Sequence, residues 1–173
     1  MRMRLIAVVA ALLPGLAFCQ GAGYDSFYFR THVGSFKLLS FNESTPSDGK
    51  LTLSFSGTIL ITGFDGPPPV ITGAVRKEYD NPKYKKQAYF GTGTITLAGK
   101  IKTFQWFGRD LKGSFQGKGV FRLYGEYDKN LETGWFRYGP DVKEQAWGNN
   151  LGWTHVVPMP GGEQMLKPVA RDS

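Results

Sequence analysis

The chain has few of the residues that metal binding or nucleophilic catalysis requires. Its 173 residues include one cysteine, Cys19, and two histidines, His32 and His155, which stand near opposite ends. A zinc site needs several such ligands at close spacing, so we predict no metal site. There is no Gly-x-Ser-x-Gly motif to suggest an activated serine. The sequence therefore indicates no cofactor, and whether the chain is an enzyme stays open.

Long apolar runs are also scarce. The longest, residues 5–13, follows Arg2 and Arg4 and is ended by Pro14 and Gly15. It is too short for a membrane-spanning helix, which needs about 20 apolar residues. A short basic segment, an apolar run and a helix breaker are the order of a secretory signal peptide. We therefore expect residues 1–19 to be a signal peptide and the chain to have no transmembrane span.

Two kinds of processing are compatible with the end of this segment. Cleavage after Cys19 would place small residues, Ala17 and Cys19, at the −3 and −1 positions, and the mature chain would start at Gln20. Alternatively, Leu16 and Cys19 match a lipobox, although Phe18 is larger than that motif favours. A lipid on Cys19 would tether the domain to a membrane. Either alternative predicts a secreted, periplasmic or extracellular protein.

Charge is modest and dispersed. The chain has 21 Lys and Arg residues against 14 Asp and Glu, a net charge of +7. The basic residues do not form the concentrated patch of a nucleic-acid binder, so we predict no nucleic-acid partner. In an exported protein, basic character suits a polysaccharide, an anionic lipid or another envelope protein as the partner.

What the chain has in abundance is glycine and aromatic residues, with 23 Gly, 13 Phe, 8 Tyr and 4 Trp. Apolar and polar side chains alternate in residues 51–56, and a period of two recurs at residues 94–97, 121–124 and 135–138. Helical spacing is nearly absent after the signal segment. Alternation between turn residues is typical of antiparallel strands. We therefore predict an all-β domain.

The predicted organisation is a single β domain over residues 20–157, followed by a loose C-terminal tail over residues 158–173, which is rich in Pro and Gly. Three arrangements remain open for the domain. They are an antiparallel sandwich, an open barrel, and a short rolled or solenoid-like sheet with glycine-punctuated strands.

A short internal repeat accompanies these strands. Residues 91–99 and 117–125 both match G-x-G-x-x-x-L-x-G, and residues 57–63 form a partial third copy. Matched glycines such as Gly93 and Gly119 suggest bends or close approaches of the backbone. The glycine-bounded strands resemble those of polymer-forming or lipid-carrying β-solenoids of bacterial envelopes, a resemblance that implies nothing about function.

The predicted binding site rests on one strand. Trp135 and Arg137 share one face of residues 135–138, and Phe136 and Tyr138 share the other. If Phe136 faces the core, Trp135 and Arg137 point outward, where they could stack on a sugar or hold an acidic group. The predicted binding residues are Trp135, Arg137 and Tyr138, with Trp106 and Arg122 as neighbours.

These observations lead to one main functional hypothesis and two alternatives. The main hypothesis is a non-catalytic exported domain that binds or scaffolds in the cell envelope or extracellular space. The first alternative is a small carbohydrate-active enzyme that uses the carboxylate pair Glu126 and Glu132. The second is a self-assembling structural protein whose copies associate through exposed strand edges.

Overall fold

The computed structural model describes residues 25–125, 134–147 and 152–158. Within these ranges the chain is almost entirely extended, with one short 3-10 helix and no α-helix, which confirms the all-β prediction. The elements are β1 (Ser26–Leu39), β2 (Ser47–Asp65), β3 (Val70–Asn81), the 3-10 helix η1 (Pro82–Tyr84), β4 (Lys86–Tyr124), β5 (Gly134–Tyr138), β6 (Gln145–Ala146) and β7 (Thr154–Val157).

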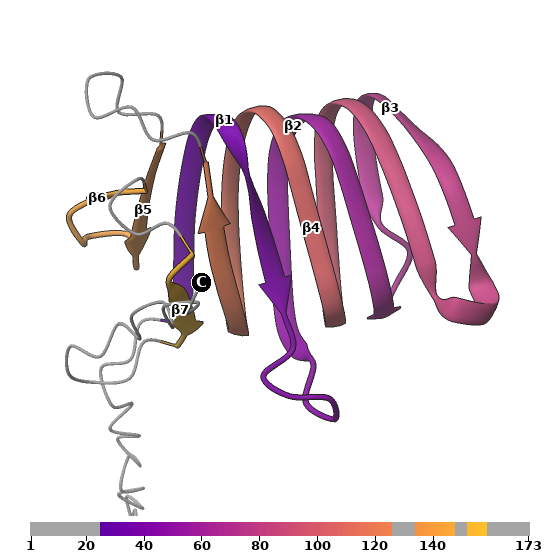
Figure 1. Cartoon of the computed structure of the whole chain (residues 1–173), viewed down its shortest axis with the longest axis horizontal. Helices are drawn as coiled ribbons and strands as arrows, with labels where there is room; N and C mark the ends of the chain where they lie inside the picture. The colour runs from indigo at the N-terminus through magenta and orange to yellow at the C-terminus, as the bar shows by residue number, and fades with distance from the viewer. Residues whose placement is uncertain (1–24, 126–133, 148–151, 159–173) are drawn as a thin grey trace, which may run out of the picture.

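The strands wind into a coil (Figure 1). β4 alone is 39 residues long, and β2 lies between two successive stretches of it. Leu53 of β2 is opposite Ile95 on one side and Gly113 on the other. One turn of the coil therefore takes 17 or 18 residues of β4. β3 pairs with the outer side of the first stretch, and β1 with the outer side of the second.

All these pairings are antiparallel. Along β1 the residue numbers rise while those of its β4 partners fall, from Ser26 opposite Gln116 to Leu39 opposite Thr103. η1 closes a hairpin between β3 and the first stretch of β4. β2 continues this hairpin by pairing in nearly the same register with the second stretch of β4, so that Ser54 is opposite Lys112. The molecule is thus one long β-hairpin rolled into a coil. This is the rolled, solenoid-like arrangement among the three that the sequence allowed.

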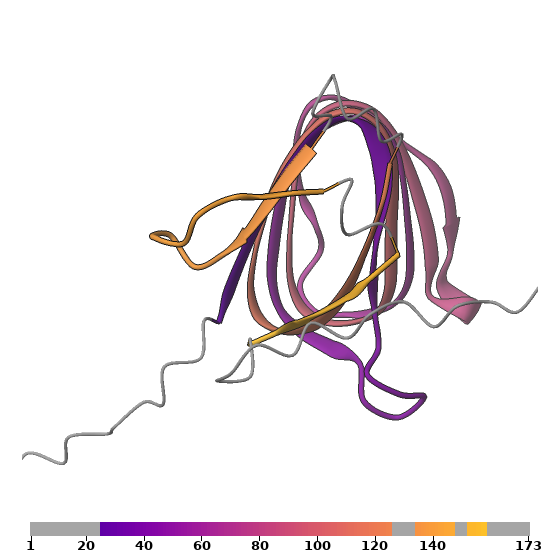
Figure 2. The same cartoon turned by 60° about the vertical axis from the view of Figure 1, so that its left-hand side comes forward.

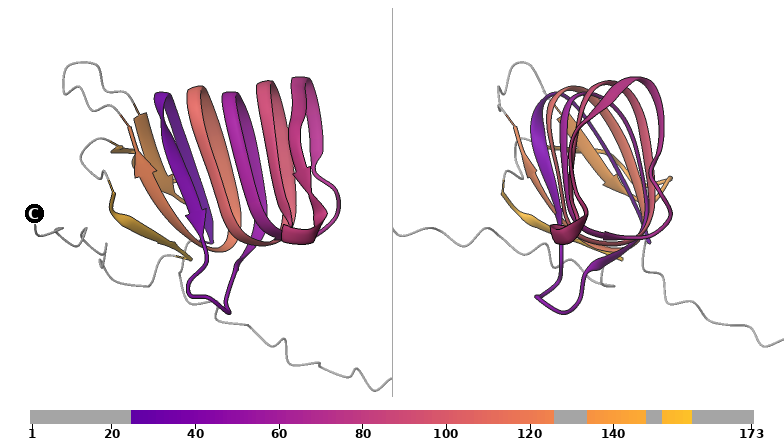
Figure 3. Two further views of the ribbon diagram at one scale, coloured as in Figure 1. Left: turned by 45° about the vertical axis from the view of Figure 1, so that its right-hand side comes forward. Right: turned by 90° about the vertical axis from the view of Figure 1, so that its right-hand side faces the viewer.

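Seen almost along its axis, the coil is a flattened oval (Figure 3, right). Alternate side chains point inward and fill it with aromatic and aliphatic groups. The predicted inward set Leu51, Leu53 and Phe55 is at most 2% exposed. Phenylalanine rings pack against one another in this core, with Phe29 and Phe36 centroids 4.8 Å apart. Because the chain is one sheet, both walls of the core come from the same rolled hairpin.

Glycines align across the strands in two rows, half a turn apart. The first row is Gly34, Gly108, Gly57 and Gly91. The second row is Gly117, Gly49 and Gly99. The two matching sequence copies therefore begin in different rows, at Gly91 and at Gly117. Their offset of 26 residues corresponds to one and a half turns of the coil, so the spacing that recurs in the structure is the turn of 17 or 18 residues.

The two ends of the coil differ. At one end β5, β6 and β7 lie beside the last turn (Figures 1 and 2). At the other end β3 pairs only with β4 among the described residues, so its outer edge has no partner there. Val70 and Tyr79 of this strand are 64% and 49% exposed. Within the described ranges, no helix has the length and apolar character to cross a membrane.

Candidate binding surface

Two of the five predicted binding residues lie in the core. Trp106 is fully buried, and its ring stacks on Phe36 with centroids 6.2 Å apart. Tyr138 is 2% exposed, and burial raises the pKa of its hydroxyl well above the usual range. Neither side chain reaches the outer surface, so both belong to the packing of the coil.

Trp135 and Arg137 lie on the outer face of β5, and Phe136 points into the core, which is the face assignment predicted for this strand. Their surroundings come from β1. The guanidinium of Arg30 lies 4.3 Å from the centroid of Trp135, and that of Arg137 lies 5.0 Å from Tyr28. Both outward cations thus already stack on rings of the same chain.

The guanidinium of Arg30 also forms an ion pair with Glu144. Its Nη2 donates a hydrogen bond of 2.8 Å to Oε2 of Glu144, and this bond holds the pKa of Glu144 below its usual range. Arg122, the fifth predicted residue, is exposed on β4 opposite Lys37 and Thr154. It is therefore not brought to Trp135, whose strand partners are Arg30 and Ala146.

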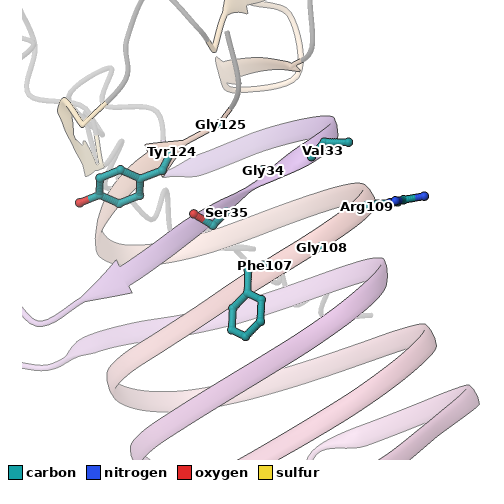
Figure 4. A pocket seen from close by; sticks show the side chains of 8 residues that line it. All are labelled: Val33, Gly34, Ser35, Phe107, Gly108, Arg109, Tyr124 and Gly125. Carbon is teal, nitrogen blue, oxygen red and sulfur yellow. The ribbon is translucent and has the colours of Figure 1, made fainter.

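A different aromatic and basic surface lies next to Trp106. Phe107, its neighbour, points outward and is 42% exposed. A shallow depression of about 560 Å³ lies beside it, where β1 and β4 turn over (Figure 4). Gly34, Gly108 and Gly125 contribute only backbone atoms to its lining. We call it the Phe107 groove, and its lining is Val33, Gly34, Ser35, Phe107, Gly108, Arg109, Tyr124 and Gly125.

The Phe107 groove combines rings with free positive charge. Arg109 is exposed and makes no ion pair with any described residue. The Lys37 ammonium lies 5.9 Å from the ring of Tyr124 and adds a second cation at the groove's margin. The site can therefore offer an apolar ring face together with hydrogen-bond donors that carry positive charge.

Phe90 provides an internal comparison for Phe107. Both residues lie opposite Thr58 of β2, one on each side, and they are separated by one turn of β4. Phe90 is similarly exposed at 47%, but the guanidinium of Arg76 lies 5.4 Å from its ring. Phe107 has no such cation among its described contacts, so its ring face is the more available of the two.

Glu126 and Glu132 lie outside the described residues, as does Cys19. Among the described residues, no three or more His, Cys, Asp or Glu side chains gather closely enough to hold a metal ion.

Comparison with known protein families, curated proteins and solved structures gave no match.

The sequence contained a signal for Phe107 that the prediction passed over. Phe104 and Trp106 are two residues apart, so they share a strand face, and together they form the more apolar of the two faces. The residue that follows, Phe107, then has to point outward. Arg109, two residues further, follows on the outer surface, whereas Val33 and Tyr124 could be placed only through the pairing of β1 with β4.

Proposed function

We propose that the chain is an exported, non-catalytic β domain that binds an acidic polysaccharide on the outer surface of its coil, in the cell envelope or outside the cell. The observation that carries this proposal is the Phe107 groove, in which an exposed phenylalanine ring lies two residues from Arg109, whose guanidinium forms no ion pair within the described part of the chain. The signal-peptide pattern at residues 1–19 supports the compartment.

The chemistry of the groove suits a sugar polymer that carries carboxylates or sulfates. An exposed aromatic ring can stack on the apolar face of a sugar ring, as amphipathic rings do at binding surfaces. The planar guanidinium of Arg109 can donate two parallel hydrogen bonds to a carboxylate. Small-molecule sites usually enclose their ligand. The Phe107 groove is shallow, so it suits a chain that runs across the surface.

The test measures binding of the mature chain to immobilised polysaccharides, with polygalacturonate and hyaluronan as acidic probes and dextran as the neutral one. Phe107→Ala should weaken binding to an acidic probe by about thirtyfold, the equivalent of a hot-spot residue worth about 2 kcal/mol. Arg109→Gln should weaken the same binding and reduce its dependence on salt.

Phe90→Ala is the matched control, because it removes an equally exposed ring one turn away and should leave binding unchanged. Equal losses in Phe90→Ala and Phe107→Ala would contradict a role for the groove. If no acidic polysaccharide binds to the unmodified chain, the proposal is wrong.

Self-assembly is a second candidate, favoured by the outer edge of β3, which pairs with no other strand of the described ranges. Residues 70–75 on this edge carry no charge, whereas Arg76, Lys77, Glu78 and Asp80 follow in its second half. Natural proteins commonly protect edge strands with charges. Sedimentation velocity over a range of concentrations should show association, and Val70→Lys should reduce it. A monomer at every concentration would rule this candidate out.

A further inference from the structure

An ordered patch of nine side chains, seven of which carry a hydroxyl group, lies on the outer face of the coil beside the Phe107 groove, where Ser56 is opposite Arg109. Three neighbouring strands each contribute three alternate residues that are in register across the sheet. We call this patch the hydroxyl array. Its members are Val70, Thr72 and Ala74 of β3, Thr96, Thr94 and Thr92 of β4, and Thr52, Ser54 and Ser56 of β2.

The hydroxyl array occupies a run of strand between the two glycine rows. On β4 it lies between Gly91 and Gly99, and on β2 between Gly49 and Gly57. Neighbouring strands are about 4.8 Å apart, and alternate residues along one strand are about 6.7 Å apart. The nine positions therefore form a two-dimensional grid with a fixed repeat in both directions.

Hydrogen bonds between strands fix the hydroxyl groups of the array. Ser56 and Thr92 share a hydrogen bond of 2.8 Å between their hydroxyl oxygens, and Thr72 bonds to Thr94 in the same way. Threonine is β-branched, which restricts χ1 and holds its methyl group in place as well. Each hydroxyl has one donor and two acceptor sites, so bonding within the array leaves capacity for an outside partner.

The array also differs from the rest of the surface in charge. The chain has 35 charged residues, 21 basic and 14 acidic, yet none occupies any of the nine positions. Beyond β2, the next stretch of β4 places charged residues beside the array, with Arg109 opposite Ser56 and Lys112 opposite Ser54. A neutral, regular surface on a basic protein fits a ligand that is itself neutral and regular.

Two neutral ligands have regular hydroxyl groups, crystalline polysaccharide and ice. Sugar-binding platforms use aromatic rings for stacking, and none of the nine side chains is aromatic. Hydroxyl and methyl groups at fixed spacing instead suit ordered water. We propose that the hydroxyl array is a binding site for the surface of ice, independent of the polysaccharide site proposed above.

The energetics favour such a ligand. Holding a water molecule at a protein surface costs up to about 2 kcal/mol of immobilisation entropy, and a water in ice is already immobilised. The array is also fixed before it binds, by the sheet and by its own hydrogen bonds, so little ordering cost falls on the protein. No charged group of the array has to be desolvated.

The experiment measures thermal hysteresis and the inhibition of ice recrystallisation by the mature chain. The unmodified protein should show both activities. Thr94→Lys places a long charged side chain at the centre of the grid and should abolish both. Circular dichroism should show an unchanged β spectrum, because Thr94 is exposed and points away from the core.

Gln116→Lys is the matched control, since it introduces the same charge on β4 at an exposed position outside the array and should leave both activities intact. Ice growth that the unmodified protein does not alter would overturn the proposal. So would full activity of a folded Thr94→Lys protein. Binding to crystalline chitin or cellulose that Thr94→Lys abolishes, without any effect on ice, would assign the array to a polysaccharide instead.

Discussion

Gly57 of β2 and Gly108 of β4 approach so closely that a Cβ atom built on either would lie 2.8 Å from the Cα atom of the other. Both also have positive φ angles, 141° and 154°. A side chain at either position must therefore push two strands apart. Gly57→Ala and Gly108→Ala should each lower the free energy of unfolding by about 1–3 kcal/mol, measured by urea denaturation.

Gly125→Ala provides the comparison for these two substitutions. The nearest atoms to a Cβ at Gly125 lie 3.6 Å away, an ordinary van der Waals distance. This variant should unfold at nearly the same urea concentration as the unmodified chain. If all three variants are equally stable, the glycine rows do not limit the approach of the strands.

The two tryptophans considered for binding should respond differently to truncation. Trp106→Ala removes a fully buried ring and should cost about 3–5 kcal/mol of unfolding free energy. Trp135→Ala removes a partly exposed ring and its contact with Arg30, and should cost about 1 kcal/mol while the fold is kept. Equilibrium denaturation followed by circular dichroism compares the two directly, and a reversed order would contradict the described burial.

Stability should fall in mild acid because of His155. Its ring is 1% exposed, 4.5 Å from the ring of Phe136, and burial lowers its pKa to about 4. An unfolded chain binds a proton at a histidine near pH 6.5, so between pH 6.5 and 4 the unfolded state holds a proton that the folded state lacks. The unfolding free energy should therefore drop across this window, by up to roughly 3 kcal/mol.

Urea denaturation at several pH values measures this dependence. His155→Phe keeps an aromatic ring among Phe27 and Phe136 and removes the titrating group, so it should reduce the slope between pH 4 and 6.5. His32→Gln alters an exposed ring and should leave the slope in place. An unchanged slope in His155→Phe would assign the acid sensitivity to other groups.

Export predicts a defined mature N-terminus. Intact mass spectrometry of the mature protein should give a chain that begins at Gln20, or one that begins at Cys19 and carries added acyl mass. A mature product that retains Met1 would contradict the signal-peptide hypothesis.

Local alternation was sufficient to predict much of the fold. Leu51, Leu53 and Phe55 point inward as expected, because a strand with one buried face has a period of two. The length of one turn of the coil could not be predicted from this alternation. Because glycines occur in both rows, the sequence motif aligned Gly91 with Gly117, which are one and a half turns apart. Only the strand pairing shows which glycines are neighbours in the structure.

The candidate sites could likewise be predicted only in part from local alternation. Trp106 and Phe107 are adjacent in a strand, so only one of them can face the core, and the prediction assigned Trp106 to the binding surface although it is the buried one. The outward direction of Thr52 and Ser54 followed from the sequence. Their alignment with Thr94 did not, because register between strands distant in the chain depends on how the hairpin is rolled.

The rolled hairpin also determines the order in which the molecule can assemble. The turn at Pro82–Tyr84 joins strands that are adjacent in the chain, so pairing can begin there on the microsecond timescale of a hairpin. β1 can pair only later, because the partners of Phe27 are Phe115 and Tyr138, which are synthesised long after it. Such distant pairings have high contact order and form slowly. A nascent chain that stops before Gly134 therefore leaves one side of β1 without its β5 partner, and this end of the coil closes only after β5 has been synthesised.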